Sequence, residues 1–131
     1  MTGTSGEFLE ELRARARSAK RRLVFPEGTE PRVHESLHDA LTSELYQPIL
    51  LGPPQAVRDG LREAGIDPER VMILDPDSPD RVERAAERYR ELRADRAMTV
   101  TDARESVRDP LLQAALMVRD GEAEGCVAGS V

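Results

Sequence analysis

The sequence predicts an α/β protein, a three-layer domain in which helices cover both faces of a parallel sheet. Over the first three units, short apolar segments alternate with amphipathic segments of helical period, as in parallel strands joined by right-handed helical crossovers. The apolar segments are uninterrupted, as at residues 49–51, which suits strands buried on both faces. Aromatic residues make up only 3% of the 131 residues, so the core must consist mainly of Leu, Val, Ile and Ala.

The first unit is predicted to begin with a helix that leads into a short strand at residues 23–25. Thr4 and Glu7 have the spacing of a capping box at the start of this helix. The apolar positions that follow share one helical face: Phe8, Leu9, Leu12 and Ala16. The basic residues between positions 13 and 22 lack interleaved aromatics. They therefore favour the solvated side of the helix over the alternative of a nucleic-acid-binding arm.

The strand at residues 23–25 is followed by a loop, residues 26–29, and then by a helix. Thr29 is predicted to be the N-cap of this helix, and Pro31 lies in its first turn, where a missing N–H does no harm. Two more strands are predicted at residues 49–51 and 71–74, with a helix between them that Gly65 closes.

The second half of the chain is predicted to be mainly helical until its last residues. Helices are expected at residues 78–92, 99–107 and 111–118, with Ser or Thr opening the first two and Asp109-Pro110 separating the last two. Residues 125–128 read as a fourth strand. Because ligands bind beyond the carboxyl ends of parallel strands, we expect the residues after this strand to open a site, the rest of which lies outside a truncated chain.

Composition and charge narrow the class of protein. The net charge of −6 disfavours nonspecific binding to nucleic acid or anionic lipid. Lys20 is the only lysine, and arginine suits bidentate recognition of phosphate, although the same arginines also suit solvated helix faces. The single cysteine, Cys126, excludes an internal disulfide and fits a cytoplasmic location, with Cys126 a small buried residue of its strand. No signal peptide, apolar span of membrane length or zinc-ligand cluster is apparent.

Several segments, in order along the chain, are similar to phosphate acetyl/butyryl transferases. Residues 22–33 resemble that family's first strand and loop, "VFPEG-x-D-x-R", and residues 117–129 resemble its "MMV-x-x-G-x-ADG-x-VSGA". Shorter matches lie between them, at residues 48–52, 73–76, 91–93, 98–99 and 103–104. The chain departs from the family pattern at Glu30, Ala97, Ala128 and Ser130.

The resemblance implies an enzyme that transfers an acetyl group reversibly between CoA and phosphate, with acetyl-CoA and acetyl phosphate as the other reactants. It further implies two α/β domains of the isocitrate-dehydrogenase-like type around a cleft, no tightly bound cofactor and, at full length, a homodimer. Family members are much longer, so residues 1–131 are expected to be the N-terminal part of the first domain and to be inactive alone. Their base and oxyanion-stabilising residues lie in the C-terminal portion, so no catalytic residue is expected here.

Five residues are candidates for the site. Arg93 matches the arginine of the family's "ELR" motif, which implies a contact with CoA; its alternative is an arginine that complements a helix dipole. Thr29 and Arg32 lie where a helix N-terminus could bind an anion, although Thr29 as a plain N-cap and Arg32 in an ion pair with a residue such as Glu27 are simpler. Gly129 and Ser130 are expected to line the cleft.

Other residue patterns favour structural roles. His34 and His38 have an i, i+4 spacing that can bind metal, but with no third ligand they are expected to face solvent. Residues 75–80 contain three aspartates, which are expected to end a strand and cap a helix. The open alternatives are phosphate butyryltransferase and a noncatalytic module that binds acyl-CoA as a regulator. A dinucleotide-binding fold would need G-x-G-x-x-G after the first strand, which residues 26–29 do not supply.

Overall fold

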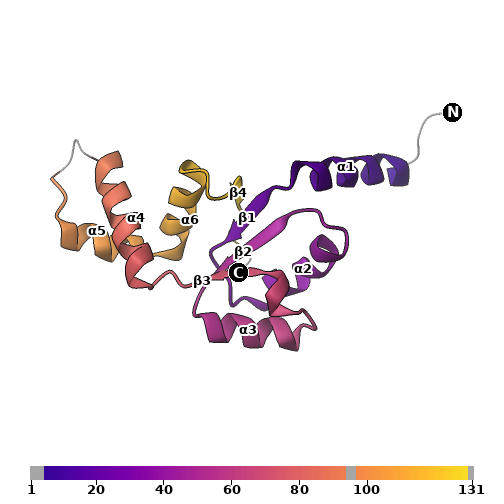
Figure 1. The fold of residues 1–131 in the computed structure, drawn as a ribbon, viewed down its shortest axis with the longest axis horizontal. Helices are drawn as coiled ribbons and strands as arrows, with labels where there is room; N and C mark the ends of the chain where they lie inside the picture. Colours follow the sequence, from indigo (N-terminus) through magenta and orange to yellow (C-terminus); the bar gives the residue numbers. More distant parts are fainter. Residues whose placement is uncertain (1–4, 94–96, 130–131) are drawn as a thin grey trace.

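The computed structural model describes residues 5–93 and 97–129, and its centre is a four-stranded parallel sheet (Figure 1). The strands are β1 (Arg22–Phe25), β2 (Gln47–Leu51), β3 (Met72–Leu74) and β4 (Gly125–Cys126). They lie in the order β3-β2-β1-β4, and each neighbouring pair is parallel. The predicted α/β class with a parallel sheet is therefore confirmed, while the isocitrate-dehydrogenase-like type stays a prediction.

The helices begin and end close to the predicted residues. They are α1 (Ser5–Ala19), α2 (Pro31–Thr42), α3 (Pro54–Glu63), α4 (Pro79–Leu92), α5 (Val100–Val107) and α6 (Pro110–Arg119), with a short 3-10 helix, η1, at Pro68–Arg70. The side chains of Ser78, Thr99 and Asp109 cap α4, α5 and α6 by accepting backbone N–H groups within the first turns. These local caps explain why the sequence located the helix starts so well.

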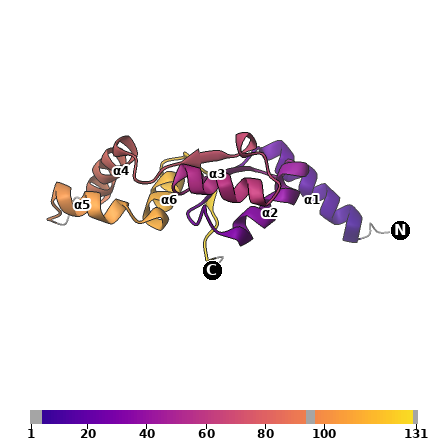
Figure 2. The same ribbon diagram turned by 90° about the horizontal axis from the view of Figure 1, so that it is seen from below.

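Helices cover both faces of the sheet, as the view in Figure 2 shows from below. On one face, Phe25 and Leu50 pack against α2 and α3. On the other face, Val24, Ile49 and Leu51 pack against Ala114 and Met117 of α6. Because successive strand side chains point to opposite faces, each uninterrupted apolar strand contributes to both cores.

Helices α4, α5 and α6 form a third hydrophobic cluster beside the sheet. Val82 and Ala86 of α4, Ala103 and Val107 of α5, and Leu116 of α6 are its buried members. In Figure 1 α4 and α5 lie at one end of the molecule and α1 at the other, with the sheet between them. Helix α6 thus belongs both to this cluster and to the cluster that contains Val24, Ile49 and Leu51, and it joins the α4–α5 unit to the sheet.

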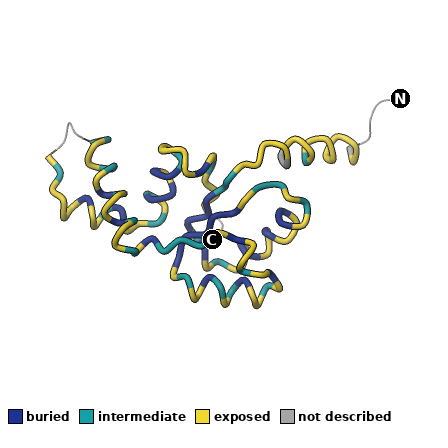
Figure 3. Tube along the Cα trace, viewed as in Figure 1, coloured by how far each residue is buried: buried dark blue, intermediate teal, exposed yellow. Residues whose placement is uncertain are grey.

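Helix α1 extends away from the sheet and is largely exposed along its length (Figure 3). Its predicted apolar face is present but not buried, since Phe8 is 60% exposed and Leu9 54%. The predicted capping residue Thr4 lies outside the described residues.

Strand β4 is shorter than predicted and changes the expected environment of Cys126. The strand covers only Gly125–Cys126 instead of residues 125–128, and it pairs with β1 at the edge of the sheet. Cys126 is consequently exposed, so the prediction of a buried residue is wrong. An apolar pattern indicates a strand but not whether a neighbour covers its outer edge.

Candidate functional site

The candidate site is the edge of the sheet at which all four parallel strands end. The loop of residues 26–30 follows β1, and residues 127–129 follow β4 beside it. Gly52 follows β2 and donates its backbone N–H to the Leu74 carbonyl of β3 at 3.2 Å, which holds the neighbouring strand ends together. Ligands of parallel α/β sheets bind beyond this edge.

Gly28 brings the loop after β1 into direct contact with β2. Its N–H donates to the carbonyl oxygen of Leu51 at 3.0 Å. A Cβ at Gly28 would lie 2.2 Å from that oxygen, so only glycine permits this approach.

The carbonyl of Gly28 is held by His34, which is only 2% exposed. His34 Nε2 lies 2.7 Å from the Gly28 oxygen, and with this carbonyl as its partner the nitrogen carries the proton and donates. The imidazole fits because Gly60 of α3 has no side chain: a Cβ there would lie 2.5 Å from the ring. The expectation that both histidines face solvent is therefore wrong for His34, whereas His38 is exposed and bonds the Ala64 carbonyl.

The loops after β1 and β4 are joined by one hydrogen bond. The backbone N–H of Gly129 donates to Glu27 Oε1 at 2.7 Å, across 102 residues of sequence. Gly129 has φ +83°, a backbone conformation that favours glycine. Partial burial, and then the nearby charge of Glu27, raise the pKa of the Cys126 thiol. The two segments that carry the predicted site residues thus meet at this edge.

The remaining residues that were predicted at this edge are Thr29, Arg32 and Ser130. Thr29 is exposed, and the N-cap of α2 is Glu30, without a side-chain capping bond, so the prediction of Thr29 as N-cap is wrong. Arg32 is exposed in the first turn of α2 and forms no ion pair with a described residue, which contradicts the expected ion pair. Ser130 lies outside the described residues.

Arg93 lies at the C-cap of α4, in the unit beside the sheet. Its guanidinium carbon is 5.5 Å from the centre of the Tyr89 ring, which is a cation–π distance. Its Nε is buried and has no hydrogen-bond partner among the described residues. The structure therefore does not bring Arg93 together with Glu27 and Gly129, but it leaves a guanidinium with capacity to donate.

At the other end of these strands, an ion pair fastens β4 to β1. Arg22 reaches Glu124 at 3.0 Å and donates to the Gly121 carbonyl at 2.7 Å. The hydrogen bonds between the side chains lower the pKa of Glu124 and raise that of Arg22. Sequence reasoning missed this pair, since nothing local links residues so far apart.

Neither a metal-ligand cluster nor a membrane-crossing helix is found in the part of the chain that the structure describes. Within residues 5–93 and 97–129, no group of three or more His, Cys, Asp or Glu side chains could hold a metal ion. The carboxylate of Asp75 instead accepts the N–H of Asp77 at 2.9 Å, which shapes the turn after β3. No helix among these residues is sufficiently long and apolar to cross a bilayer.

Comparisons with known proteins all point to one group. The family model described as phosphate acetyl/butaryl transferase matches residues 7–131. The phosphate acetyltransferases of Acetivibrio thermocellus and Corynebacterium glutamicum are 36% and 31% identical over 95% and 96% of this chain, but over only 37% and 39% of their own lengths. A phosphotransacetylase structure from Streptococcus pyogenes superposes with a TM-score of 0.88 at 27% identity, covering 98% of this chain and 39% of that one. The chain thus spans less than two-fifths of the relatives that it matches.

Proposed function

The chain belongs to the phosphate acetyl/butyryl transferase family, and we propose that it contributes one wall of the active-site cleft of a phosphate acetyltransferase. The reaction is the reversible transfer of an acetyl group between CoA and phosphate, with no tightly bound cofactor. Because relatives named phosphate acetyltransferase are more than twice as long, residues 1–131 would form the N-terminal part of the first of two domains.

The observation that carries this proposal is the hydrogen bond between Gly129 and Glu27. It joins the two segments that match the family motifs, at the sheet edge where α/β proteins bind ligands. The loop at Gly28 is fixed on one side by Leu51 and on the other by His34, so its backbone is preorganised. A rigid edge of this kind can position an acyl phosphate without itself taking part in the chemistry.

In the proposed reaction, the CoA thiolate attacks the acyl-phosphate carbonyl, and the acyl–oxygen bond to phosphate breaks. A base takes the thiol proton, and a cation with hydrogen-bond donors stabilises the oxyanion. We assign none of these roles to a described residue. Arg93 would instead bind CoA, because its guanidinium can pair with a phosphate group.

The finer features of the proposed enzyme follow from its family. They are the isocitrate-dehydrogenase-like architecture, a homodimer, a cytoplasmic location and a role in acetate metabolism. The family description also covers butyryl transfer, and a noncatalytic module that binds acyl-CoA is the other alternative.

A chimera tests the function directly. Residues 1–131 would replace the matching segment of the Streptococcus pyogenes phosphotransacetylase, whose structure this chain follows. We expect the chimera to form acetyl-CoA from acetyl phosphate and CoA, and the 131-residue chain alone to show no turnover. A folded chimera that binds acetyl-CoA without turnover would favour the noncatalytic module, and faster turnover of butyryl phosphate would favour butyryl transfer.

The same chimera tests Arg93. Losing a charge-assisted contact with phosphate is expected to raise the KM for CoA by about tenfold or more in Arg93→Ala, with a smaller change for acetyl phosphate. Arg108→Ala is the matched control, because Arg108 is an exposed arginine at the C-cap of α5. An unchanged KM for CoA in Arg93→Ala would remove this assignment.

A further inference from the structure

Helix α1 carries an apolar stripe that is left exposed in the described part of the chain. Phe8 is 60% exposed, Leu9 54% and Leu12 42%. Figure 1 shows α1 at the end of the molecule opposite α4 and α5, and Figure 3 shows that its turns are exposed. Large apolar side chains gathered on one solvent-exposed helix face mark a surface for association.

The apolar surface continues from α1 onto the body of the chain. A groove with a volume of about 370 Å³ lies next to the helix. Its apolar lining comes from Leu9 and Leu12 of α1, from Leu23 of β1, and from Leu45 and Tyr46 before β2. A partner that packs against the stripe can therefore also bury part of this groove.

The charged residues of α1 are segregated along the helix, which indicates the kind of partner. The acidic residues lie in the first half and the basic residues in the second: Glu7, Glu10 and Glu11, then Arg13, Arg15 and Arg17. A second copy of the helix that runs antiparallel places its acidic half beside the basic half of the first. A parallel copy would instead bring like charges together, so the pattern favours an antiparallel copy of α1 itself.

Glu11 and Arg15 lie on the accessible side of the stripe. They follow Phe8 at i+3 and i+7, which places them on the same helical face. Arg15 pairs with Glu11 at 3.0 Å within the helix, and their side chains are 74% and 62% exposed. Nearly the opposite side of α1 is turned towards its own chain, because Arg13 pairs there with Asp39 of α2 at 3.3 Å. The face of Glu11 and Arg15 is thus the one that a second molecule can reach.

We propose that α1 pairs with α1 of a second copy of this chain in an antiparallel, two-fold symmetric contact. Such a contact is isologous, so each interaction occurs twice. With the two-fold axis near position 13, Glu11 of each copy lies level with Arg15 of the other, and the two Leu12 side chains lie beside each other. Phe8 of each copy extends over the second half of the partner helix, towards the groove. The contact rests on α1 and the adjoining groove alone and not on the proposed reaction.

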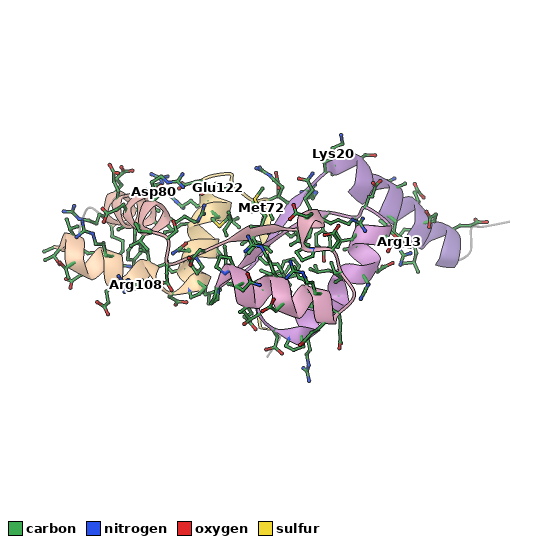
Figure 4. The ribbon with its side chains drawn as sticks, turned by 60° about the horizontal axis from the view of Figure 1, so that its bottom comes forward. Arg13, Lys20, Met72, Asp80, Arg108 and Glu122 are labelled. Atoms are coloured by element: carbon green, nitrogen blue, oxygen red, sulfur yellow. The ribbon has the colours of Figure 1, made fainter. Side chains whose placement is uncertain are left out.

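Sedimentation equilibrium of the 131-residue chain tests the contact. One chain has a mass of 14.5 kDa, and we expect a species of twice that mass to be populated at concentrations of about 1–100 µM. Leu12→Gln removes apolar surface at the two-fold axis from both copies and should weaken dimerisation by about tenfold or more. Leu111→Gln is the matched control, because Leu111 is also exposed, at 52%, and lies in the first turn of α6. It follows shortly after Arg108, which Figure 4 shows towards the opposite end of the molecule from Arg13.

An exchange of charges tests the antiparallel direction. Glu11→Arg and Arg15→Glu each leave a face of one sign, so each variant alone should dimerise at least about threefold more weakly than the unchanged chain. An equimolar mixture should recover the dimer, because the basic face of one variant then meets the acidic face of the other.

Three results would overturn the proposal. They are a chain that stays monomeric over the whole concentration range, equal dimerisation of Leu12→Gln and Leu111→Gln, and a mixture of the charge variants that associates no more than either variant alone. The first result would leave a further segment of the same polypeptide as the occupant of the stripe. None of the three bears on acetyl transfer, which the chimera tests separately.

Discussion

Replacing Gly28 with alanine tests whether the loop after β1 is built by close backbone approach. The new Cβ would lie 2.2 Å from the Leu51 oxygen, 2.9 Å from its carbonyl carbon and 3.0 Å from its nitrogen. All three atoms belong to the backbone of a central strand, so no side-chain rotation can relieve the overlap. The loop must move, and the 3.0 Å hydrogen bond from Gly28 to Leu51 is then lost.

The expected cost combines two effects. Overpacking of this kind costs about 1–3 kcal/mol, and the lost hydrogen bond about 0.5–1.5 kcal/mol, so Gly28→Ala should destabilise the chain by about 2–4 kcal/mol. Gly121→Ala is a control with a different physical basis. Gly121 has φ +82°, and apart from its chain neighbours no heavy atom of the described residues lies within 4 Å of the point that an alanine Cβ would occupy, so only backbone strain of about 1–2 kcal/mol is expected there.

Urea unfolding followed by circular dichroism measures both variants. With a urea slope of about 1–3 kcal/mol per molar, Gly28→Ala should lower the midpoint by roughly 1–4 M without changing the slope. Gly121→Ala should lower it by less. If Gly28→Ala unfolds at the same urea concentration as Gly121→Ala or above it, the close approach of the loop to Leu51 is refuted.

Three further substitutions test other contacts. Arg22 lowers the folded-state pKa of Glu124, so their pair stabilises the fold above the unfolded pKa of about 4.3 and is lost as the pH falls through the folded value; Glu124→Gln should flatten this acid limb of Tm against pH, and an unchanged limb would contradict the pair. Burial and the charge of Glu27 raise the pKa of the Cys126 thiol, so its alkylation by iodoacetamide should need a higher pH than that of an ordinary cysteine, and Glu27→Gln should lower the pH of half-maximal rate; a fixed midpoint would exclude the influence of Glu27. His34→Leu leaves a buried carbonyl unpaired and should cost about 1–3 kcal/mol in urea unfolding, whereas an unshifted midpoint would show that the hydrogen bond is dispensable.

The sequence was sufficient to predict the helices and strands, because the residue patterns that define them are local. Apolar runs ended by turn residues predicted three strands. The starts of three helices were predicted from Ser78, from Thr99 and from the break at Asp109-Pro110, and in each case the Ser, Thr or Asp side chain caps the helix. Such caps act within one helical turn and need no tertiary partner. Thr29 shows the limit of this reasoning, since the helix begins one residue later, at a position without a side-chain cap.

The contacts that shape the candidate site could not be predicted, because each depends on a distant residue. His34 is buried only because Gly60 of another helix leaves room for its ring. Cys126 is exposed because its strand lies at the sheet edge, which is a property of strand order. Glu27 and Gly129 were each part of a quoted motif, but their pairing follows from β1 lying next to β4.

The side chain of Gln113 connects the turn after β3 with the end of α5. Its Nε2 bonds both the Pro76 carbonyl, in the turn after β3, and the Val107 carbonyl, at the end of α5. This amide therefore helps to fix the α4–α5 unit, and with it Arg93, relative to the sheet edge at Gly129.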